Sequence, residues 1–147
     1  ENIRFYAGIY EIPRKDINKR ADELIEKLGM EQVRNKLISD IPLGWKQKLS
    51  FSIAIIHNPK IVFLDEPTGG VDPITRRQFW SLIYEAASND ITVFVTTHYM
   101  DEAEYCDRVT IMSEGKIVAL DTPKNLMDEH NANDMDEVFL QLVRNKE

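Results

Sequence analysis

The sequence predicts an α/β fold in which helices precede a parallel sheet and a helical tail follows it. Two apolar runs, 61–64 and 91–97, have the length of buried strands, and a segment with helical periodicity lies between them. Asp65 and Glu66 follow the first run directly, and His98 follows the second. Because parallel strands end at the same edge of a sheet, we expect these three side chains at one edge.

The N-terminal part, residues 1–58, is predicted to be helical. Its first clear signal is an amphipathic stripe of apolar residues at helical spacing. The stripe consists of Ile17, Ala21, Leu24, Ile25 and Leu28, with Gly29 at its end. A short helix that carries Val33 and Leu37 is predicted next. After Gly44, a more apolar helix is predicted to run to His57.

The segment between the two strands opens with signals for a turn and then a helix start. Gly69 and Gly70 permit tight backbone geometry. Asp72 suits the N-cap position of a helix, and Pro73 suits its first helical position. The predicted helix carries an apolar stripe of Phe79, Leu82, Ile83, Ala86 and Ala87.

The C-terminal third is predicted to form a hairpin followed by two helices. Strands at 108–113 and 116–120 flank a two-residue turn at 114–115 with the sequence Glu-Gly. Thr122 and Pro123 are typical of a helix start. A second helix is indicated by the spacing of Met135, Val138, Phe139 and Leu142.

The polar groups after the two strands suit phosphate chemistry. A magnesium ion keeps several waters and takes one or two carboxylates together with phosphate oxygens, a role that suits Asp65. Phosphoryl transfer also needs a group that orients or deprotonates the attacking water, and Glu66 suits that role. His98 can hydrogen-bond a terminal phosphate. Taken alone, the Asp-Glu pair is also compatible with a simple strand end.

Composition indicates a globular protein and narrows its function class. The 147 residues carry a net charge of −7, which argues against a broad nucleic-acid-binding face. The apolar runs are far shorter than the roughly 20 residues that span a bilayer. The single cysteine, Cys106, excludes an internal disulfide and is interpreted as a packing residue. The acidic run 101–104 is interpreted as a solvated helix start.

The ordered motifs resemble those of an ATP-binding cassette (ABC) ATPase domain, over nearly the whole chain. Residues 64–68, Leu-Asp-Glu-Pro-Thr, resemble its Walker B strand with the catalytic glutamate. Residues 70–72 resemble its D-loop, and Thr97-His98 resembles its switch histidine. The resemblance implies a partial P-loop NTPase fold with three parts. These are a helical, signature-loop subdomain at 1–58, a catalytic α/β core portion at 59–121 and a helical tail at 122–147.

The signature loop departs from the family pattern Leu-Ser-Gly-Gly-Gln. Its five positions are occupied by Ile41, Pro42, Leu43, Gly44 and Trp45. Only the second glycine survives, and Pro42 offers neither a hydroxyl nor an N–H to a phosphate. Three interpretations stay open: an active ATPase whose loop binds phosphate by backbone groups, a degenerate and slow site, or a plain helix-start loop. Trp45 is compatible with stacking on nucleotide, packing on a partner subunit, or ordinary partial burial.

The chain contains no Gly-x-x-x-x-Gly-Lys-Ser/Thr motif, the P-loop that supplies most phosphate contacts in the family. We therefore expect the chain to be part of a longer polypeptide and to bind ATP weakly, if at all, by itself. We also expect its sheet to lack strands, which would leave open edges and apolar surface. Self-association, or pairing with a missing half, would cover that surface.

The resemblance implies a transport ATPase in which two nucleotide-binding domains, identical or different, enclose two Mg-ATP molecules. Asp65 would hold the magnesium ion, Glu66 would polarise the attacking water and His98 would contact the γ-phosphate. The five signature positions would bind the nucleotide of the partner domain, and Asp72 would link the two sites. A transmembrane permease domain or subunit is the expected partner, at the cytoplasmic face of the membrane, and no nucleic acid is expected.

Residues near the switch histidine and in the tail resemble the exporter-type branch, although the substrate is not readable from them. Two other function classes stay open. One is an ABC ATPase of translation or DNA repair that is not tied to a membrane. The other is a non-catalytic regulatory half-cassette, which would predict drift in the catalytic residues, whereas Asp65, Glu66 and His98 are all present.

Overall fold

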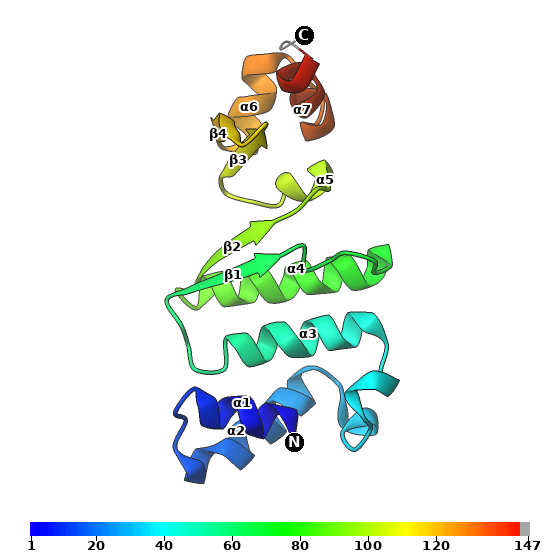
Figure 1. The fold of residues 1–147 in the computed structure, drawn as a ribbon, viewed down its shortest axis with the longest axis vertical. Helices are drawn as coiled ribbons and strands as arrows, with labels where there is room; N and C mark the ends of the chain where they lie inside the picture. The colour runs from blue at the N-terminus through cyan, green and yellow to red at the C-terminus, as the bar shows by residue number, and fades with distance from the viewer. Residues whose placement is uncertain (145–147) are drawn as a thin grey trace. The chain divides into compact units, whose positions relative to one another are not determined.

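The computed structural model describes residues 1–144 and has a mixed α/β architecture (Figure 1). It divides into two compact units, the first spanning Glu1–Thr96 and the second beginning at Thr97. The sequence-based boundaries after residues 58 and 121 divide the chain by expected function instead of by compactness. These boundaries stay predictions. No helix among residues 1–144 is both long enough and apolar enough to cross a membrane.

The helical part of the first unit packs around a small apolar core. Its elements are α1 (Asn2–Ile9), α2 (Arg14–Lys27), the 3-10 turns η1 (Glu31–Val33) and η2 (Ile38–Asp40), and α3 (Leu43–Ala54). The core consists of Ile3, Ala21, Met30, Ile41, Leu49 and Ile53. The stripe predicted for α2 is confirmed, because Ala21 lies in this core and Leu24, Ile25 and Leu28 pack against it.

The predicted short helix through Val33 and Leu37 is wrong. The chain forms 3-10 turns there, in which the Val33 N–H donates to the carbonyl of Met30. Leu37 is 71% exposed, so the four-residue spacing between these apolar residues did not reflect a shared buried face. The helix predicted to run to His57 ends earlier, at Ala54, and Asn58 then turns the chain with φ +54°.

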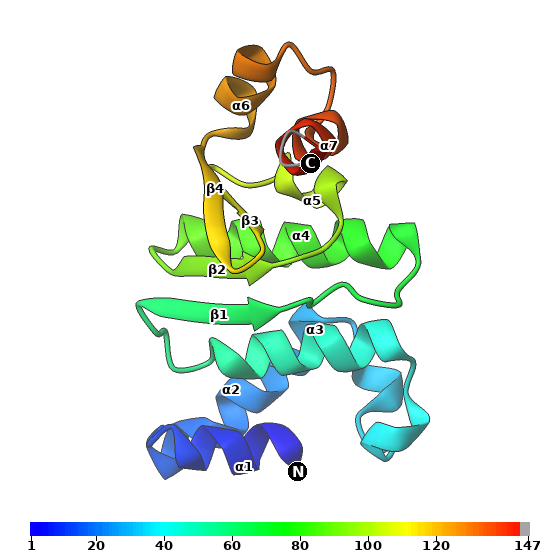
Figure 2. The same ribbon diagram turned by 45° about the horizontal axis from the view of Figure 1, so that its top comes forward.

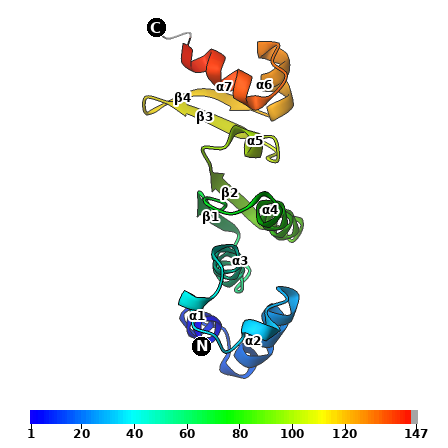
Figure 3. The ribbon, with the colours of Figure 1, turned by 90° about the vertical axis from the view of Figure 1, so that its right-hand side faces the viewer.

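The central part of the first unit is a parallel two-stranded sheet with one helix against it. Strands β1 (Ile61–Asp65) and β2 (Thr92–Thr96) pair in register, so that Asp65 lies opposite Thr96. The connecting helix α4 (Pro73–Ser88) lies along one side of the pair (Figure 3). Its buried side chains are Phe79, Trp80, Ile83 and Ala86. Two parallel strands joined through a helix confirm the arrangement expected from the sequence.

The two strands are not buried on both faces, which corrects the prediction. Alternate residues face α4 or the opposite side, and on the opposite side Phe63 is 73% exposed and Phe94 is 53% exposed. Their rings contact each other, with centroids 5.6 Å apart. Apolar runs of this kind are typical of strands covered on both sides, whereas within residues 1–96 only one face is covered. The expected open apolar surface is therefore present.

The second unit places a hairpin against three helices (Figure 2). Its elements are α5 (Met100–Ala103), β3 (Val109–Ser113), β4 (Lys116–Asp121), α6 (Pro123–His130) and α7 (Met135–Arg144). Its core consists of Ala103, Ile111, Leu126, Met135 and Val138. Both predicted C-terminal helices are thus confirmed, and the Thr122 side chain caps α6 by accepting from the Asn125 N–H.

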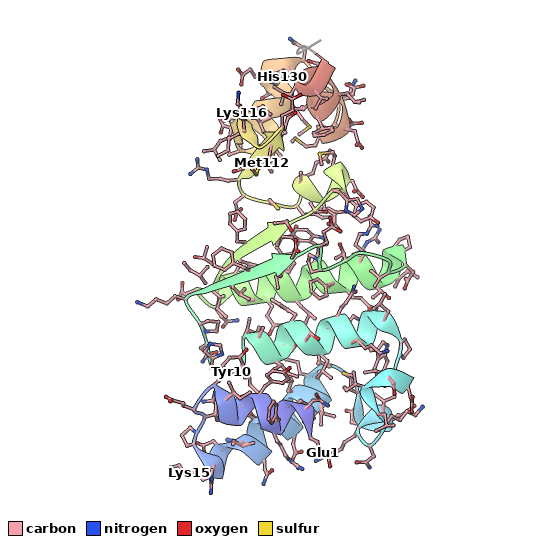
Figure 4. The ribbon with its side chains drawn as sticks, viewed as in Figure 1. Glu1, Tyr10, Lys15, Met112, Lys116 and His130 are labelled. Carbon is pink, nitrogen blue, oxygen red and sulfur yellow. The ribbon has the colours of Figure 1, made fainter. Side chains whose placement is uncertain are left out.

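The hairpin forms at the predicted turn. Glu114 and Gly115 have φ values of +51° and +74°, as a tight two-residue turn between twisted strands requires. An irregularity between Ile111 and Met112, which the sequence did not indicate, shifts the register of the strands. Beyond it, Met112 on the outer side of the hairpin is 61% exposed (Figure 4).

Candidate functional site

The carboxyl end of β1 presents the two predicted acidic residues. Asp65 is the last residue of the strand, and Glu66 follows it. The Thr96 hydroxyl donates to Asp65 Oδ1 at 2.5 Å, and the Glu66 N–H donates to the Thr96 carbonyl at 3.0 Å. Thr96 thus fixes both the side chain of Asp65 and the backbone of Glu66. The sequence alone does not indicate this role of Thr96, because it depends on the register between the strands.

Glu66 occupies the left-handed region of backbone space, with φ +43°. A side chain with a Cβ is disfavoured there, and such strain of about 1–3 kcal/mol is typically retained where function requires it. The Gly69 N–H donates to the Glu66 carbonyl at 3.0 Å, which closes a tight turn directly after the strand. The turn directs Glu66 out of the strand, next to Asp65 and exposed to solvent.

Asp72 caps helix α4, as predicted. Its Oδ1 accepts from the backbone N–H groups of Ile74 and Thr75, each at 3.0 Å, and its Oδ2 accepts from the Thr75 hydroxyl at 2.5 Å. These bonds, with that from the Thr75 side chain foremost, hold the pKa of Asp72 below its ordinary value. Asp72 is therefore a fixed carboxylate at the N-terminus of α4.

The five signature positions differ in their surroundings. Ile41 is buried in the helical core, Pro42 immediately precedes α3, and Leu43 is 50% exposed. Gly44 lies against Thr75 of α4, where a Cβ atom would come within 2.3 Å of Thr75 Cγ2. Trp45 is half-buried against the helical core.

Side chains of α3 connect that helix to the turn that follows β1 and to α4. The Gln47 amide donates to the carbonyl of Gly69 at 3.1 Å, and the Lys48 ammonium donates to the Gln78 amide oxygen. Burial lowers the pKa of Lys48 from its ordinary value, an effect opposed by the nearby charge of Asp72. Side-chain hydrogen bonds therefore hold the N-terminal half of α3 to the N-terminal half of α4 and to the turn before it, within the first unit.

His98 belongs to the second unit and lies in the segment that leads into α5. Its ring packs against that of Tyr99, with centroids 4.1 Å apart. The Thr97 hydroxyl donates to Glu102 Oε2 at 2.7 Å and accepts from the Tyr99 N–H at 3.1 Å. Glu102 is completely buried, so the prediction that the acidic run 101–104 is solvated is wrong at this position.

The residues at the end of β1 suit a magnesium ion that is coordinated mainly by phosphate oxygens and water. No group of three or more His, Cys, Asp or Glu side chains suited to hold a metal is found in the part of the chain that the structure describes. A magnesium ion needs only one or two carboxylates, because water and phosphate oxygens complete its octahedron. Asp65, exposed and held by a neighbouring hydroxyl, fits that role.

Comparison with known proteins identifies the family. The family model described as ABC transporter matches residues 1–69. The probable multidrug ABC transporter ATP-binding protein YbhF of Escherichia coli K12 is 41% identical over 149 residues, covering 97% of this chain. The chain belongs to the ABC transporter ATP-binding family. A fluoroquinolones export ATP-binding protein of Mycobacterium tuberculosis is 36% identical and covers 86% of the chain.

Solved structures confirm the fold class of the chain as part of an ABC ATPase. The structure of cbiO1 from Clostridium perfringens, part of the transporter complex cbiONQ, has a TM-score of 0.74 at 29% identity and covers 86% of the chain. An ATP-binding subunit of another ABC transporter has a TM-score of 0.80 over 96% of the chain, and at 23% identity it shows the fold alone.

The chain spans only part of each of these proteins. It covers 26% of the length of YbhF and 41% of the fluoroquinolones export protein. Among the solved structures, it covers 51% of cbiO1 and 60% of the second ATP-binding subunit. The match therefore extends over nearly all of this ABC-family chain, and over a quarter to three fifths of these four proteins.

Proposed function

We propose that the chain is the C-terminal part of the ATP-hydrolysing subunit of an ABC exporter, with ATP and Mg²⁺ as its ligands. The observation that carries the proposal is the pair at the end of β1. Asp65 is held by the Thr96 hydroxyl, and Glu66 is held in a left-handed turn beside it. One carboxylate is thereby placed to bind a hydrated cation and the other to act on a water molecule.

Each residue has a separate role in the proposed reaction. Magnesium, when bound with ATP, neutralises charge on the phosphates. Asp65 orients the water shell of that ion, while Glu66 accepts a hydrogen bond from the attacking water and polarises it toward the γ-phosphorus. His98 donates a hydrogen bond to the γ-phosphate. Asp72 links the two sites across the interface of paired cassettes, in the orientation fixed by its helix cap.

ATP hydrolysis by these residues also requires a P-loop, which the 147 residues do not contain. We call a polypeptide that holds these residues together with a P-loop an intact cassette. We propose that the 147 residues alone neither bind ATP tightly nor hydrolyse it. Calorimetry with Mg-ATP up to millimolar concentration tests this, and micromolar binding to the chain alone would contradict it.

The altered signature loop is proposed to bind phosphate through its backbone. Helix α3 begins at Leu43, and the first N–H groups of a helix lie outside its own hydrogen-bond ladder. The N–H groups of Leu43 and Gly44 therefore point out of the N-terminal end of α3, where the helix dipole favours an anion. Pro42 and the side chains of Ile41 and Trp45 contribute shape rather than hydrogen bonds in this proposal.

The proposed partners are a second nucleotide-binding domain, identical or different, and a transmembrane permease. The names of the relatives support this, since YbhF is named a probable multidrug ABC transporter ATP-binding protein and cbiO1 is described as part of an ABC transporter complex. The proposed location is the cytoplasmic face of a membrane, where closing and opening of the paired cassettes would drive the permease.

Steady-state ATPase measurements on the intact cassette test the catalytic assignment. Glu66→Gln keeps the shape of the side chain and removes its basicity, so kcat should fall by about a hundredfold or more while ATP binding persists. His98→Ala should also lower kcat strongly. Glu26→Gln, on the exposed side of α2, is the matched control and should leave turnover unchanged. Wild-type turnover in Glu66→Gln would overturn the proposed function.

A further inference from the structure

The second unit contains a buried carboxylate to which the proposed reaction gives no role. Glu102 has no exposed surface, although it lies in a run of acidic residues on the short helix α5. Burying a charged group is unfavourable unless hydrogen bonds compensate, so its position indicates a specific purpose. Its Oε2 accepts from the Thr97 hydroxyl at 2.7 Å. Thr97 is the residue immediately before His98.

The Thr97 hydroxyl is held at both its donor and its acceptor side. A hydroxyl has one proton to donate and two lone pairs that accept. Glu102 receives the proton, so a lone pair of the hydroxyl is directed at the Tyr99 N–H, which lies 3.1 Å away. This bond closes a tight turn in which His98 is the central residue. The carboxylate therefore sets the orientation of the hydroxyl, and the hydroxyl sets the backbone on both sides of His98.

The imidazole ring of His98 packs against the side chain of Tyr99, the last residue of this turn. The rings of His98 and Tyr99 lie 4.1 Å apart between centroids, with an interplanar angle of 37°. Any change in the backbone at Tyr99 would therefore move the surface that supports the imidazole. The chain of contacts runs from Glu102 through Thr97 to Tyr99 and ends at the ring of His98.

We propose that Glu102 and Thr97 are positioning residues that hold His98 ready for the γ-phosphate; this inference rests on the proposed function of His98. Neither side chain touches the nucleotide. They act by fixing one conformation of the turn. His98 is then already ordered before the phosphate binds, so that binding carries no further entropic cost for ordering this side chain. A carboxylate suits this position better than a neutral acceptor, because charge-assisted bonds from a hydroxyl are the stronger ones.

Another glutamate of the same segment offers a comparison. Glu104 follows α5 and accepts from the N–H of Met135 at 3.2 Å, which anchors the start of α7. It thus connects elements of the second unit, as Glu102 does, but its bond lies away from the turn around His98. A loss of structure alone should appear in variants of both glutamates, whereas a loss of histidine positioning should appear only in those of Glu102 and Thr97.

Steady-state kinetics on the intact cassette test the proposal, with an unfolding temperature recorded for every variant. Thr97→Val keeps the shape and removes the hydroxyl, and kcat should fall about tenfold with KM for ATP within about twofold. Thr97→Ser should restore kcat to near the wild-type value. Glu102→Gln, which keeps an acceptor oxygen without the charge, should lower kcat by about threefold. Glu104→Gln is the matched control and should keep wild-type kcat.

A double variant separates positioning from other effects. In a His98→Ala background, Thr97→Val should lower kcat no further, because residues that act through one group are not additive. An additive loss, or a wild-type kcat in Thr97→Val when His98→Ala is slow, would overturn the inference and leave the proposed function intact. If Thr97→Val fails to fold, Glu102→Gln should be measured in the wild-type and His98→Ala backgrounds instead. The same two outcomes, no further loss of kcat or an additive loss, then support or overturn the inference. Wild-type kcat in His98→Ala would overturn both proposals.

Discussion

Gly44 and Thr75 approach each other so closely that no side chain larger than hydrogen fits between them. A Cβ on Gly44 would lie 2.3 Å from Thr75 Cγ2. Thr75 cannot turn away freely, because its hydroxyl donates to Asp72 Oδ2. Gly44, the one glycine at the five predicted signature positions, is thus the residue at which α3 and α4 meet, which gives it a packing role.

Gly44→Ala should therefore destabilise the fold, although alanine is normally the better helix former. Overpacking at a tight contact costs about 1–3 kcal/mol, which exceeds the gain of about 1 kcal/mol expected from replacing glycine in a helix. Thermal or urea unfolding of the variant against wild type measures the net effect. An unfolding free energy equal to or above that of wild type would contradict the prediction.

The compensating change lies at Thr75. Thr75→Ser removes Cγ2 and keeps the hydroxyl that bonds to Asp72. In this background Gly44→Ala should be neutral or stabilising, so the two substitutions should show a coupling of more than 1 kcal/mol in a double-mutant cycle, at the scale of about 0.5–3 kcal/mol typical of contacting residues. Simple additivity would show that the contact does not limit packing.

The strained backbone at Glu66 predicts a trade-off between stability and activity. Glu66→Gly removes the Cβ that makes φ +43° unfavourable and should raise the unfolding free energy by about 1 kcal/mol. Glu66→Ala loses the same carboxylate but retains a Cβ, so it should gain no such stability. Urea unfolding of the two variants provides the comparison, and ATPase activity of the intact cassette should be lost in both. Equal stability of the two variants would contradict strain at this position.

Much of the local structure could be predicted because its signals lie within a few residues of each other. The Asp72-Pro73 start of α4, the Thr122 cap of α6 and the hairpin turn at 114–115 all formed as expected. Each depends on one or two side chains that satisfy neighbouring backbone groups, so no distant contact is needed to specify it. The position of the Asp65-Glu66 pair could be predicted in the same way, because an apolar strand ends directly at these polar residues.

Other features could not be predicted because they depend on residues far away in the sequence. The apolar character of Phe63 and Phe94 indicates a face suited to burial and says nothing about which element covers it. The bond from Thr96 to Asp65 follows from strand register, which one apolar run cannot specify alone. Glu102 appeared as one member of an acidic run, and only the packing of the second unit shows that it is buried.

The open face of the β1–β2 sheet predicts that the 147-residue chain self-associates. Phe63 and Phe94 present contiguous aromatic surface beside strand edges that pair with no third strand among residues 1–144, and such surface is removed from water when two molecules meet. Sedimentation velocity over a range of concentrations should show association of the wild-type chain, which Phe63→Lys should weaken. Ile74→Lys is the control, since Ile74 is similarly exposed, at 71%, on α4 instead of the sheet. A wild-type chain that stays monomeric at every concentration would contradict the prediction.

The reactivity of Cys106 should depend on pH as expected for a partly buried thiol. Burial, followed by the nearby charges of Asp107 and Glu102, raises the pKa of Cys106 to about 11 from an ordinary value of 9.0. A thiol reacts as its thiolate, and about two pH units separate the folded and ordinary pKa values, so the folded chain should contain about a hundredfold less thiolate near pH 8. The chain has a single cysteine, so alkylation by iodoacetamide reports this group alone.

The same shift links pH to the stability of the fold. Because the folded state favours the neutral thiol, its contribution to the unfolding free energy is complete below about pH 9 and is lost as the pH rises through about 11. Cys106→Ala, which cannot ionise, should lose less stability over that window than wild type in urea unfolding. The alkylation rate should rise toward pH 11 in the folded chain and reach its plateau earlier in urea. Equal alkylation rates for the folded and unfolded chain at pH 8 would show that burial does not protect the thiol.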